Sequence, residues 1–332
     1  MTRPLPDAGA PLPPDVAADA FGRILDGMAD DTALARFLTA LADRGETVDE
    51  IVAAARMLRK RVNHPMQYAD AIDVCGTGGD GKHSLNISTA VAITVAACGV
   101  KVAKHGNRAA SSISGAADVL AVLGIPELPF DRLGPCLESV GITFLHAARH
   151  HPAMARVAPV RRALGRRTIF NLLGPLANPA GVKRQLVGVY DPARTLDMAM
   201  ALQALGSDRA MVVHGQGYDE LTVTGDNHVV CYDFEGVPSL SSTILLPESA
   251  GVGRHPEALL AGADPAHNAA RLRALLAGEQ GAYHDMVVLN AAAALTIASD
   301  TLMSIAVAAK TARTAIASGA AADTLARWSA FR

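Results

Sequence analysis

Hydrophobic residues recur at helical spacing throughout the first part of the chain. Three such patterns follow one another with no strand pattern between them, at residues 16–28, 32–44 and 48–61. Asp31 and Thr47 stand where side-chain oxygens commonly cap the first turn of a helix. The pattern therefore predicts a small all-helical domain at the start of the chain.

Beyond residue 66 the pattern changes to short apolar runs that alternate with helical segments, and the chain is predicted to be helical from residue 264 onward. Strands are predicted at residues 71–75, 100–103, 142–145, 185–190, 210–214 and 228–233. Such alternation is typical of an α/β domain with a mainly parallel central sheet, whose ligands bind at the carboxyl ends of the strands. We expect a helical domain at 1–68, to which 152–180 return, and an α/β domain formed by 69–151 and 181–332.

The composition narrows the possible functions. Of the 332 residues, 50% are hydrophobic and only 4% are aromatic, which allows a large core of small aliphatic side chains. With 30 Lys and Arg against 32 Asp and Glu, the formal net charge of -2 offers no basic field to nucleic acid or to an anionic membrane. A small-molecule ligand is the better expectation.

The cysteines and the apolar runs indicate a cytoplasmic protein. The four cysteines are scattered without a C-x-x-C pair, as expected of buried thiols in a reducing compartment. The longest apolar runs, at 89–98 and 286–298, are too short to span a bilayer. The first fifteen residues are rich in Pro and Ala and lack the hydrophobic segment of a signal peptide.

The strongest sign of chemistry lies between residues 72 and 107. A predicted strand leads into the segment GTGGDG at 76–81, whose small side chains leave the backbone amides open to a ligand. Asn86, Ser88 and Thr89 then precede the apolar run of the next helix, so hydroxyl groups and free first-turn amides face the same place. This order of residues predicts a phosphate-binding site, although a glycine loop alone is also a common strand-to-helix turn.

Two common phosphate motifs fit this stretch only in part. The glycines match G-x-G-x-x-G, but Lys104 lies close to where that fingerprint needs an acidic residue. The P-loop pattern fails because His83 stands at the position of its magnesium-binding hydroxyl. Asp80 inside the loop would repel a phosphate unless a cation lay beside it, so we infer a divalent metal, Mg²⁺, carried on phosphate oxygens.

Eight segments together resemble the anthranilate phosphoribosyltransferase family, in the order and at the spacing of that family. They span positions 76 to 295, and several are long enough to be specific. They read GTGGDG, NIST, KHGNR, SSISG, HHPAM, RTIFNLLGPLANP, VVHGQGYDEL and LNAAAAL.

The resemblance implies transfer of a 5-phosphoribosyl group from phosphoribosyl pyrophosphate to anthranilate in tryptophan biosynthesis, with release of pyrophosphate. It also implies the fold of nucleoside phosphorylases and phosphoribosyltransferases, Mg²⁺ as cofactor and a homodimer through the helical domain. No side chain is expected to form a covalent intermediate. The residues implied for binding phosphoribosyl pyrophosphate are Gly76, Thr77, Gly78, Gly79, Asp80, Asn86, Ser88, Thr89, Lys104 and Ser112.

The resemblance further assigns the acceptor and the metal to particular residues. Arg161 is the implied contact for the anthranilate carboxylate, a planar group that guanidinium binds well. The implied pocket consists of Gly76, Asn107, His151, Arg161 and Pro175. The implied metal ligands are Ser88, Asp219 and Glu220. If these roles hold, three turns from distant parts of the chain must meet at one rim of the sheet.

Four positions depart from the family pattern and leave the details of the acceptor pocket open, namely Ile113, His146, Ala148 and Arg149. Two other readings also remain. A pyrimidine nucleoside phosphorylase would share the expected fold but use free phosphate and a nucleoside. A non-catalytic nucleic-acid-binding relative would need a basic groove, which the net charge and the acidic pair Asp219 and Glu220 disfavour.

Overall fold

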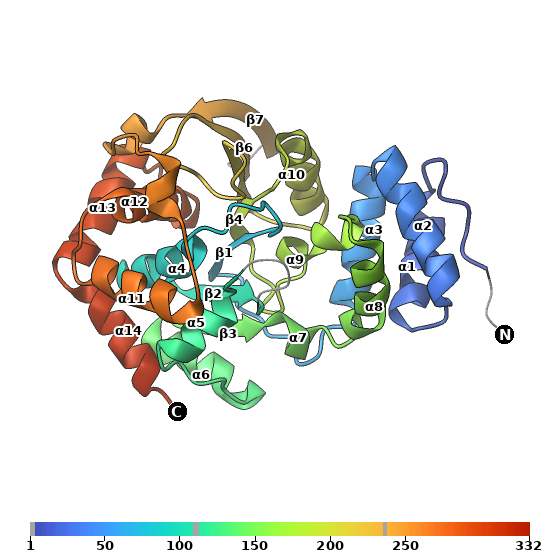
Figure 1. Cartoon of the computed structure of the whole chain (residues 1–332), viewed down its shortest axis with the longest axis horizontal. Coiled ribbons are helices and arrows are strands. Elements are labelled where there is room, and N and C mark those ends of the chain that lie inside the picture. The colour runs from blue at the N-terminus through green and yellow to red at the C-terminus, as the bar shows by residue number, and fades with distance from the viewer. Residues whose placement is uncertain (1–3, 109–112, 235–237) are drawn as a thin grey trace.

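The structure is a computed structural model, and it describes residues 4–108, 113–234 and 238–332. The first helices lie at one end of the molecule, where a helix from the middle of the chain joins them (Figure 1). This later helix, α8, packs against both α1 and α2. The group consists of α1 (Pro14–Leu25), α2 (Asp31–Arg44), α3 (Val48–Arg59) and α8 (Met154–Leu164).

Side-chain caps define the starts of two of these helices. Thr47 and Glu50 form a capping box at the start of α3, in which the Glu50 carboxylate accepts the Thr47 amide at 2.8 Å. At the start of α2 the capping oxygen belongs to Asp30, which accepts the amide of Ala33 at 2.8 Å. Asp31, expected as the start signal, is instead the first residue within the helix.

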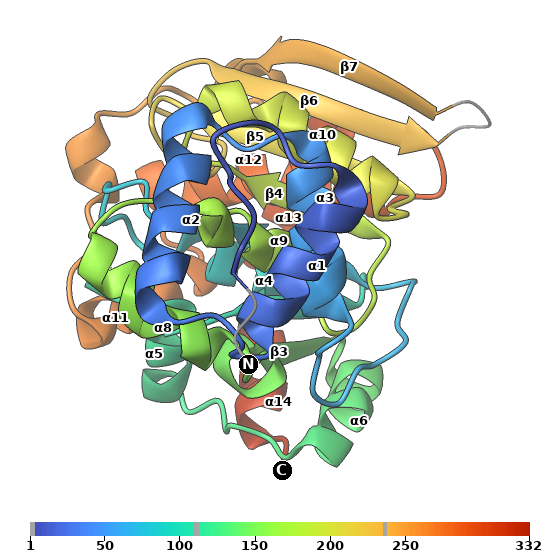
Figure 2. The same cartoon turned by 90° about the vertical axis from the view of Figure 1, so that its right-hand side faces the viewer.

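The centre of the molecule is one seven-stranded sheet with the strand order β3-β2-β1-β4-β5-β6-β7. The first five strands in this order run parallel, and β6 and β7 are antiparallel additions at one edge (Figure 2). The prediction of a mainly parallel sheet is confirmed. The strands are β1 (Ile72–Gly76), β2 (Val102–Gly106), β3 (Ile142–His146), β4 (Arg184–Gly188), β5 (Arg209–Gly215), β6 (Asn227–Phe234) and β7 (Pro238–Leu245).

Helices cover both faces of this sheet. On one face lie two helices that are buried almost all round, because further helices pack behind them. These are α4 (Ile87–Ala97) and α12 (Ala282–Ala298), backed by α11 (Pro265–Leu276), α13 (Ile305–Ala317) and α14 (Ala320–Ala330). Near β3 the chain adds α5 (Ala116–Val122), α6 (Phe130–Val140) and α7 (Ala147–His150). No helix among the described residues is long and apolar enough to cross a membrane.

The opposite face of the sheet shares a core with the helices at the start of the chain. The helix α10 (Thr195–Ala204) packs against both β5 and α3. Phe21 of α1 and Val187 and Val212 of the sheet belong to the same buried cluster. The helical domain therefore rests on the sheet through continuous apolar packing, while the exact division of the chain into domains stays a prediction.

Two strand predictions differ from the structure. The second strand was expected to end at residue 103, whereas β2 continues to Gly106 and includes Lys104 and His105 as buried members. The strand continues because the Lys104 ammonium finds partners inside the fold. The strand β7 was not predicted, since a hairpin strand at the sheet edge has one solvent-facing side and its serines weaken the apolar signal.

Candidate active site

The glycine loop leaves the carboxyl end of β1 and leads into α4. Gly78, Gly79 and Gly81 have φ angles of 69°, 73° and 76°, a region of the backbone that favours glycine. The loop is tied across the sheet rim, because the Gly78 amide donates to the Asp219 carboxylate at 2.6 Å. The expected loop is therefore in contact with the expected acidic turn.

The acidic turn follows β5, at the carboxyl end of the strand. Besides the bond from Asp219 to the glycine loop, Glu220 accepts the backbone amide of Ser88 at 3.1 Å, in the first turn of α4. Burial and the nearby Asp80 raise the pKa of Asp219 to about 7, and burial with the neighbouring Asp219 raises the pKa of Glu220. Because these buried carboxyl groups lie near one another, binding of a proton or of a metal ion is favoured at this turn.

Lys104 lies beneath this turn and not on the pocket surface. Its ammonium donates to the carbonyl oxygen of Val74 at 2.9 Å and to the Ser88 hydroxyl at 3.1 Å. Burial lowers the pKa of Lys104. The expected site requires that the glycine loop, Lys104 and the acidic turn meet. They do so through one chain of contacts, in which Gly78 bonds to Asp219, and Ser88 bonds both to Glu220 and to Lys104.

A pocket with an empty volume of about 580 Å³, partly open to solvent, lies over this rim. Half of the residues expected to bind phosphoribosyl pyrophosphate line it, namely Gly78, Gly79, Asp80, Asn86 and Ser88. Both acids of the turn line it as well. Lys104 and the buried Thr89 lie behind the wall, whereas Gly76 and Thr77 lie at the end of β1. Ser112 lies outside the described residues.

Two glycines make room for the acidic turn. Gly76 of β1 and Gly188 of β4 are paired in the sheet. A β-carbon at Gly76 would overlap the Asp219 side chain, and one at Gly188 would overlap the carbonyl group of Asp219. Gly188 was not singled out from the sequence, because its role depends on a segment thirty residues away that only the fold brings close.

Two buried asparagines also support the rim from the C-terminal helices, where no chemistry was predicted. Asn290 of α12 accepts the Leu221 amide at 3.0 Å and donates to the carbonyl oxygen of the same residue at 2.7 Å. This pair of bonds holds the backbone next to Glu220. Asn268 of α11 lines the pocket and bonds to Asn86. Asn290 lies in the family segment LNAAAAL, which gave it no role, and the only sequence signal of Asn268 is a polar residue in a helix that is otherwise largely apolar on its buried side.

Two histidines mark the expected acceptor region. The rings of His105 and His151 meet edge to face with centroids 5.2 Å apart, and both side chains are buried. Nδ1 of His105 contacts the carbonyl oxygen of Gly174 at 3.1 Å, next to the predicted Pro175. Nε2 of His105 has no hydrogen-bond partner among the described residues, and the only group that acts as an acceptor toward the described His151 ring is the backbone of Ala177. A buried polar atom without a partner needs an explanation, and a bound water or ligand is one.

Burial keeps both imidazoles neutral. Burial, helped by the nearby His150, lowers the pKa of His151 to about 4, and burial, helped by the nearby His151, lowers the pKa of His105 to about 3. An uncharged pair at this position suits an aromatic ring better than an ionic group. The expected anthranilate contact at His151 is compatible with this environment and stays a prediction.

Arg161 is the other main acceptor residue. Its guanidinium lies 5.9 Å from the centroid of the Phe170 ring, and it has no hydrogen-bond or ion-pair partner in the described part of the chain. Burial lowers its pKa. A half-buried guanidinium without a partner is available for an incoming carboxylate. None of the described contacts joins Arg161 to His151 or to Asn107, whose side chain bonds the amide of Arg108.

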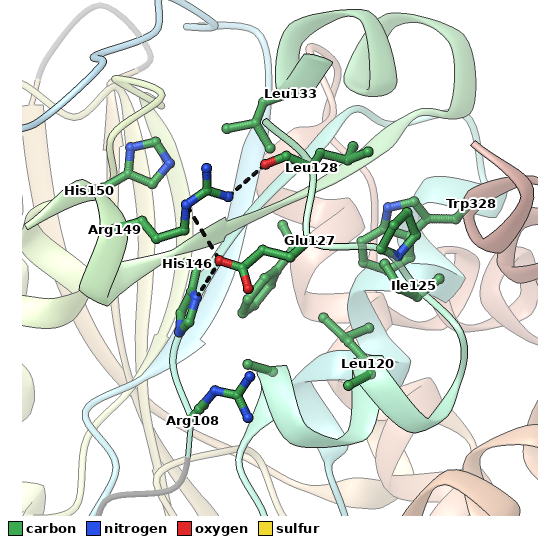
Figure 3. A pocket seen from close by; sticks show the side chains of 14 residues that line it. Arg108, Leu120, Ile125, Glu127, Leu128, Leu133, His146, Arg149, His150 and Trp328 are labelled. Atoms are coloured by element: carbon green, nitrogen blue, oxygen red, sulfur yellow. Dashed lines mark hydrogen bonds and ion pairs between the residues drawn. The ribbon is translucent and has the colours of Figure 1, made fainter. Parts of the chain in front are cut away.

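Two of the four departures from the family pattern, His146 and Arg149, line a second pocket (Figure 3). There His146 and Arg149 both point toward Glu127, at 3.3 and 3.4 Å from its Oε1. None of the residues expected to bind donor or acceptor lines this pocket. Ile113, in contrast, lines the pocket at the glycine loop. His146 and Arg149 thus line a pocket away from the residues expected at the acceptor, and Ile113 lies at the glycine loop, so their effect on the acceptor stays open.

The residues at the rim fit a magnesium ion shared with a ligand. Among the described residues, no group of three or more His, Cys, Asp and Glu side chains is placed to hold a metal by itself. Mg²⁺ is usually held by one or two carboxylates together with substrate phosphates and water. Asp219 and Glu220, whose pKa values are raised by burial and by the neighbouring acids, supply such a partial set of hard oxygen donors.

The family comparisons agree with this fold and site. Residues 8–62 match the helical bundle domain of a glycosyl transferase family, and residues 68–322 match the a/b domain of the same family. The chain is thus a two-domain glycosyl transferase. An anthranilate phosphoribosyltransferase of Novosphingobium aromaticivorans is 53% identical over 302 residues, which cover 89% of each chain. The chain belongs to the anthranilate phosphoribosyltransferase family, as its sequence motifs predict.

Solved structures support the same assignment. The anthranilate phosphoribosyltransferase of Thermus thermophilus is 43% identical and superposes with a TM-score of 0.91, over 97% of this chain and 96% of that one. The Saccharomyces cerevisiae enzyme, solved in complex with PRPP and Mg, is 27% identical, with a TM-score of 0.85 over 96% of this chain and 92% of that one. The predicted fold class and the predicted kind of enzyme are confirmed.

The neutral state of His151 makes a prediction about stability. Because its pKa is about 4 in the folded protein and about 6.5 when exposed, the unfolded state binds the extra proton between these values. Stability from this group is full above pH 6.5 and is lost as the pH falls toward 4. Urea unfolding at several pH values in this window measures how steeply the free energy of unfolding rises with pH. In His151→Asn this rise should be smaller by up to about 1.4 kcal/mol per pH unit.

The exposed His267 provides the control for this measurement. His267→Asn should leave the pH dependence of the free energy of unfolding unchanged. If the free energy of unfolding depended on pH equally in His151→Asn and in the unmodified protein, the neutral, buried state of His151 would be contradicted.

Proposed function

We propose that this chain transfers the 5-phosphoribosyl group from phosphoribosyl pyrophosphate to the amine of anthranilate, and that the donor binds in the pocket at the glycine loop. The observation that carries this proposal is the meeting of the Gly78 amide, the first turn of α4 and the acids Asp219 and Glu220 at one rim. A diphosphate needs amide donors and a cation site side by side, and this rim offers both.

The main chemical task is to stabilise the leaving group. Breaking the C1–O bond places negative charge on pyrophosphate and positive charge on the ribose ring. Amides of the glycine loop other than that of Gly78, which is bonded to Asp219, can face the negative charge together with the N-terminal end of α4, and Lys104 adds a positive charge behind Ser88. Asn86 is placed to contact the sugar or a phosphate.

Mg²⁺ is the proposed cofactor, held through Ser88, Asp219 and Glu220. When bound, it would neutralise charge on the pyrophosphate oxygens. The residues of the chain then keep the donor oriented, since the acidic turn is fixed on one side by Gly78 and on the other by Asn290.

The acceptor side works by positioning. Arg161 is proposed to bind the anthranilate carboxylate, with the neutral His151 against the ring and Asn107, Gly76 and Pro175 nearby. An arylamine is nucleophilic without a strong base, so binding in the correct orientation supplies the main rate effect. No side chain is assigned a covalent or acid–base role.

The activity is tested by the loss of anthranilate fluorescence with phosphoribosyl pyrophosphate, with and without MgCl₂. Consumption that requires both additions is the expected result. Phosphorolysis of thymidine with free phosphate, in place of the anthranilate reaction, would support a nucleoside phosphorylase. Tight, salt-dependent binding of DNA without either activity would support the non-catalytic alternative.

Replacing Arg161 by Ala is expected to raise the KM for anthranilate about tenfold to a hundredfold, because a charge-assisted contact with the carboxylate is lost. The kcat and the KM for phosphoribosyl pyrophosphate should change much less. Steady-state kinetics with each substrate varied in turn measures this difference. The adjacent, exposed Arg162 gives the control Arg162→Ala, and an effect of equal size there would refute the assignment.

We further propose a homodimer through the helical domain, a cytoplasmic location and the two-domain division expected above. Exposed apolar side chains on α10 beside α3, Leu196 and Met200, support a further contact near this domain. None of the four cysteines, all of them described, is joined in a disulfide, which supports a reducing compartment. Light scattering after gel filtration tests the dimer, and a monomeric mass at micromolar concentration would exclude it.

A further inference from the structure

Asn86 stands at the start of α4, where an asparagine side chain commonly caps the helix. Here it forms no cap, although it occupies the N-cap position. The amide of Ser88, one of the groups that a capping side chain would accept, donates to Glu220 instead. The orientation of the Asn86 carboxamide is therefore decided by other neighbours.

The decisive neighbour is Asn268, in the first turn of α11. Its side-chain oxygen accepts the backbone amide of Ala263 at 2.8 Å, and its NH₂ group donates to Oδ1 of Asn86 at 2.9 Å. A backbone N–H can only donate, so the oxygen of Asn268 must face Ala263. The NH₂ group must then face Asn86. Asn268 is 1% exposed, so water does not compete for these bonds.

The consequence lies on the opposite side of the Asn86 carboxamide. Its oxygen is occupied by Asn268 and, at 3.5 Å, by the hydroxyl of Ser114. The side chain of Asn86 lines the donor pocket, and its NH₂ group has no partner among the described residues. The reverse orientation would set two NH₂ groups against each other and present an oxygen to an anionic ligand.

We propose that Asn268 is a positioning residue that holds Asn86 with its NH₂ group toward the phosphoribosyl donor. This inference rests on the proposed function, since it takes the ligand of the pocket to be a phosphorylated sugar. It assigns a role to α11, a helix outside the motifs of the donor site. The hydroxyl of Tyr283, from α12, donates to the carbonyl oxygen of Asn86 at 3.2 Å and fixes the backbone of the same residue.

The test is Asn268→Asp. The new carboxylate can still accept the Ala263 amide, but it has no donor for Asn86 and attracts its NH₂ group, which turns the Asn86 oxygen toward the ligand. We expect the KM for phosphoribosyl pyrophosphate to rise about tenfold to a hundredfold. The KM for anthranilate should stay within about twofold, because the change affects one side of the site.

A second variant separates orientation from structural support. Asn268→Ala removes both bonds and leaves Asn86 free to adopt either orientation, so its effect on the same KM should be smaller than that of Asn268→Asp. Its thermal midpoint, in contrast, should fall further, because it leaves the Ala263 amide without its partner. A purely structural role would give the opposite order of KM values.

Two comparisons complete the design. When Asn86 is already replaced by Ala, adding Asn268→Asp should change the KM for phosphoribosyl pyrophosphate by less than about twofold, since the two residues act as a unit. His267 is exposed in the same turn of α11, so the variant His267→Asp controls for the added negative charge. Additive effects, or an equal effect of His267→Asp, would overturn the inference. If the unmodified protein consumes no anthranilate, the proposed function fails first and the inference with it.

Discussion

The double variant Asp219→Asn with Glu220→Gln is expected to lose about a thousandfold in kcat/KM while remaining folded. Both substitutions keep an oxygen that can accept the bonds from Gly78 and Ser88, so the acidic turn should stay in place. What disappears is the negative charge that would attract Mg²⁺. Loss of metal-assisted stabilisation of the leaving group costs several kcal/mol, which corresponds to roughly this factor.

A binding measurement makes this prediction independent of turnover. For the unmodified protein, MgCl₂ with pyrophosphate should raise the thermal midpoint, and the rise should be larger at pH 8 than at pH 6. The reason is that the pKa of Asp219 is raised to about 7, so a bound proton competes with the metal at low pH. The double variant should show neither the rise nor its pH dependence.

Removal of the acids should also increase stability in the absence of metal. A carboxyl with a raised pKa destabilises the folded state as the pH rises from the unfolded value of 3.8 toward about 7. At pH 8 the double variant should thus unfold at a higher temperature than the unmodified protein. The control is Asp226→Asn, since Asp226 lies in the same connection between β5 and β6 and forms an exposed ion pair with Arg254. This variant should leave the rise in thermal midpoint with MgCl₂ and pyrophosphate unchanged.

The second large effect is expected for Gly188→Ala. The added methyl group would overlap the backbone carbonyl of Asp219, an atom that does not move as a side chain could. Either the acidic turn shifts or β4 does, and both changes separate Asp219 from Gly78. We expect kcat/KM to fall about a hundredfold or more and the free energy of unfolding to fall by about 1–3 kcal/mol, as for overpacked sites.

Gly253→Ala is the matched control, because a β-carbon there meets no atom within 4 Å and the residue has no positive φ angle. Kinetics and urea unfolding of the two variants should differ clearly. Full activity of Gly188→Ala would mean that the acidic turn need not lie against β4, which would contradict the proposed site.

Several features could be predicted from the sequence because their signals are local. The capping residue Thr47, the apolar runs of the parallel strands and the glycine loop are each encoded within a few neighbouring residues. The motifs were also sufficient to predict the family. The strand β7 and the extension of β2 through Lys104 were missed, because both depend on partners in other elements.

From the sequence, most helices and the parallel strands could be predicted and the glycine loop could be proposed as a phosphate site, since backbone freedom and apolar spacing are properties of the local chain. Tertiary structure alone decided how these groups act together. It placed Lys104 behind Ser88, seated Asp219 in the space left by Gly188, and turned the carboxamide of Asn86 through Asn268. Such roles depend on atoms from segments far apart in the chain, whose approach follows from packing of the whole core.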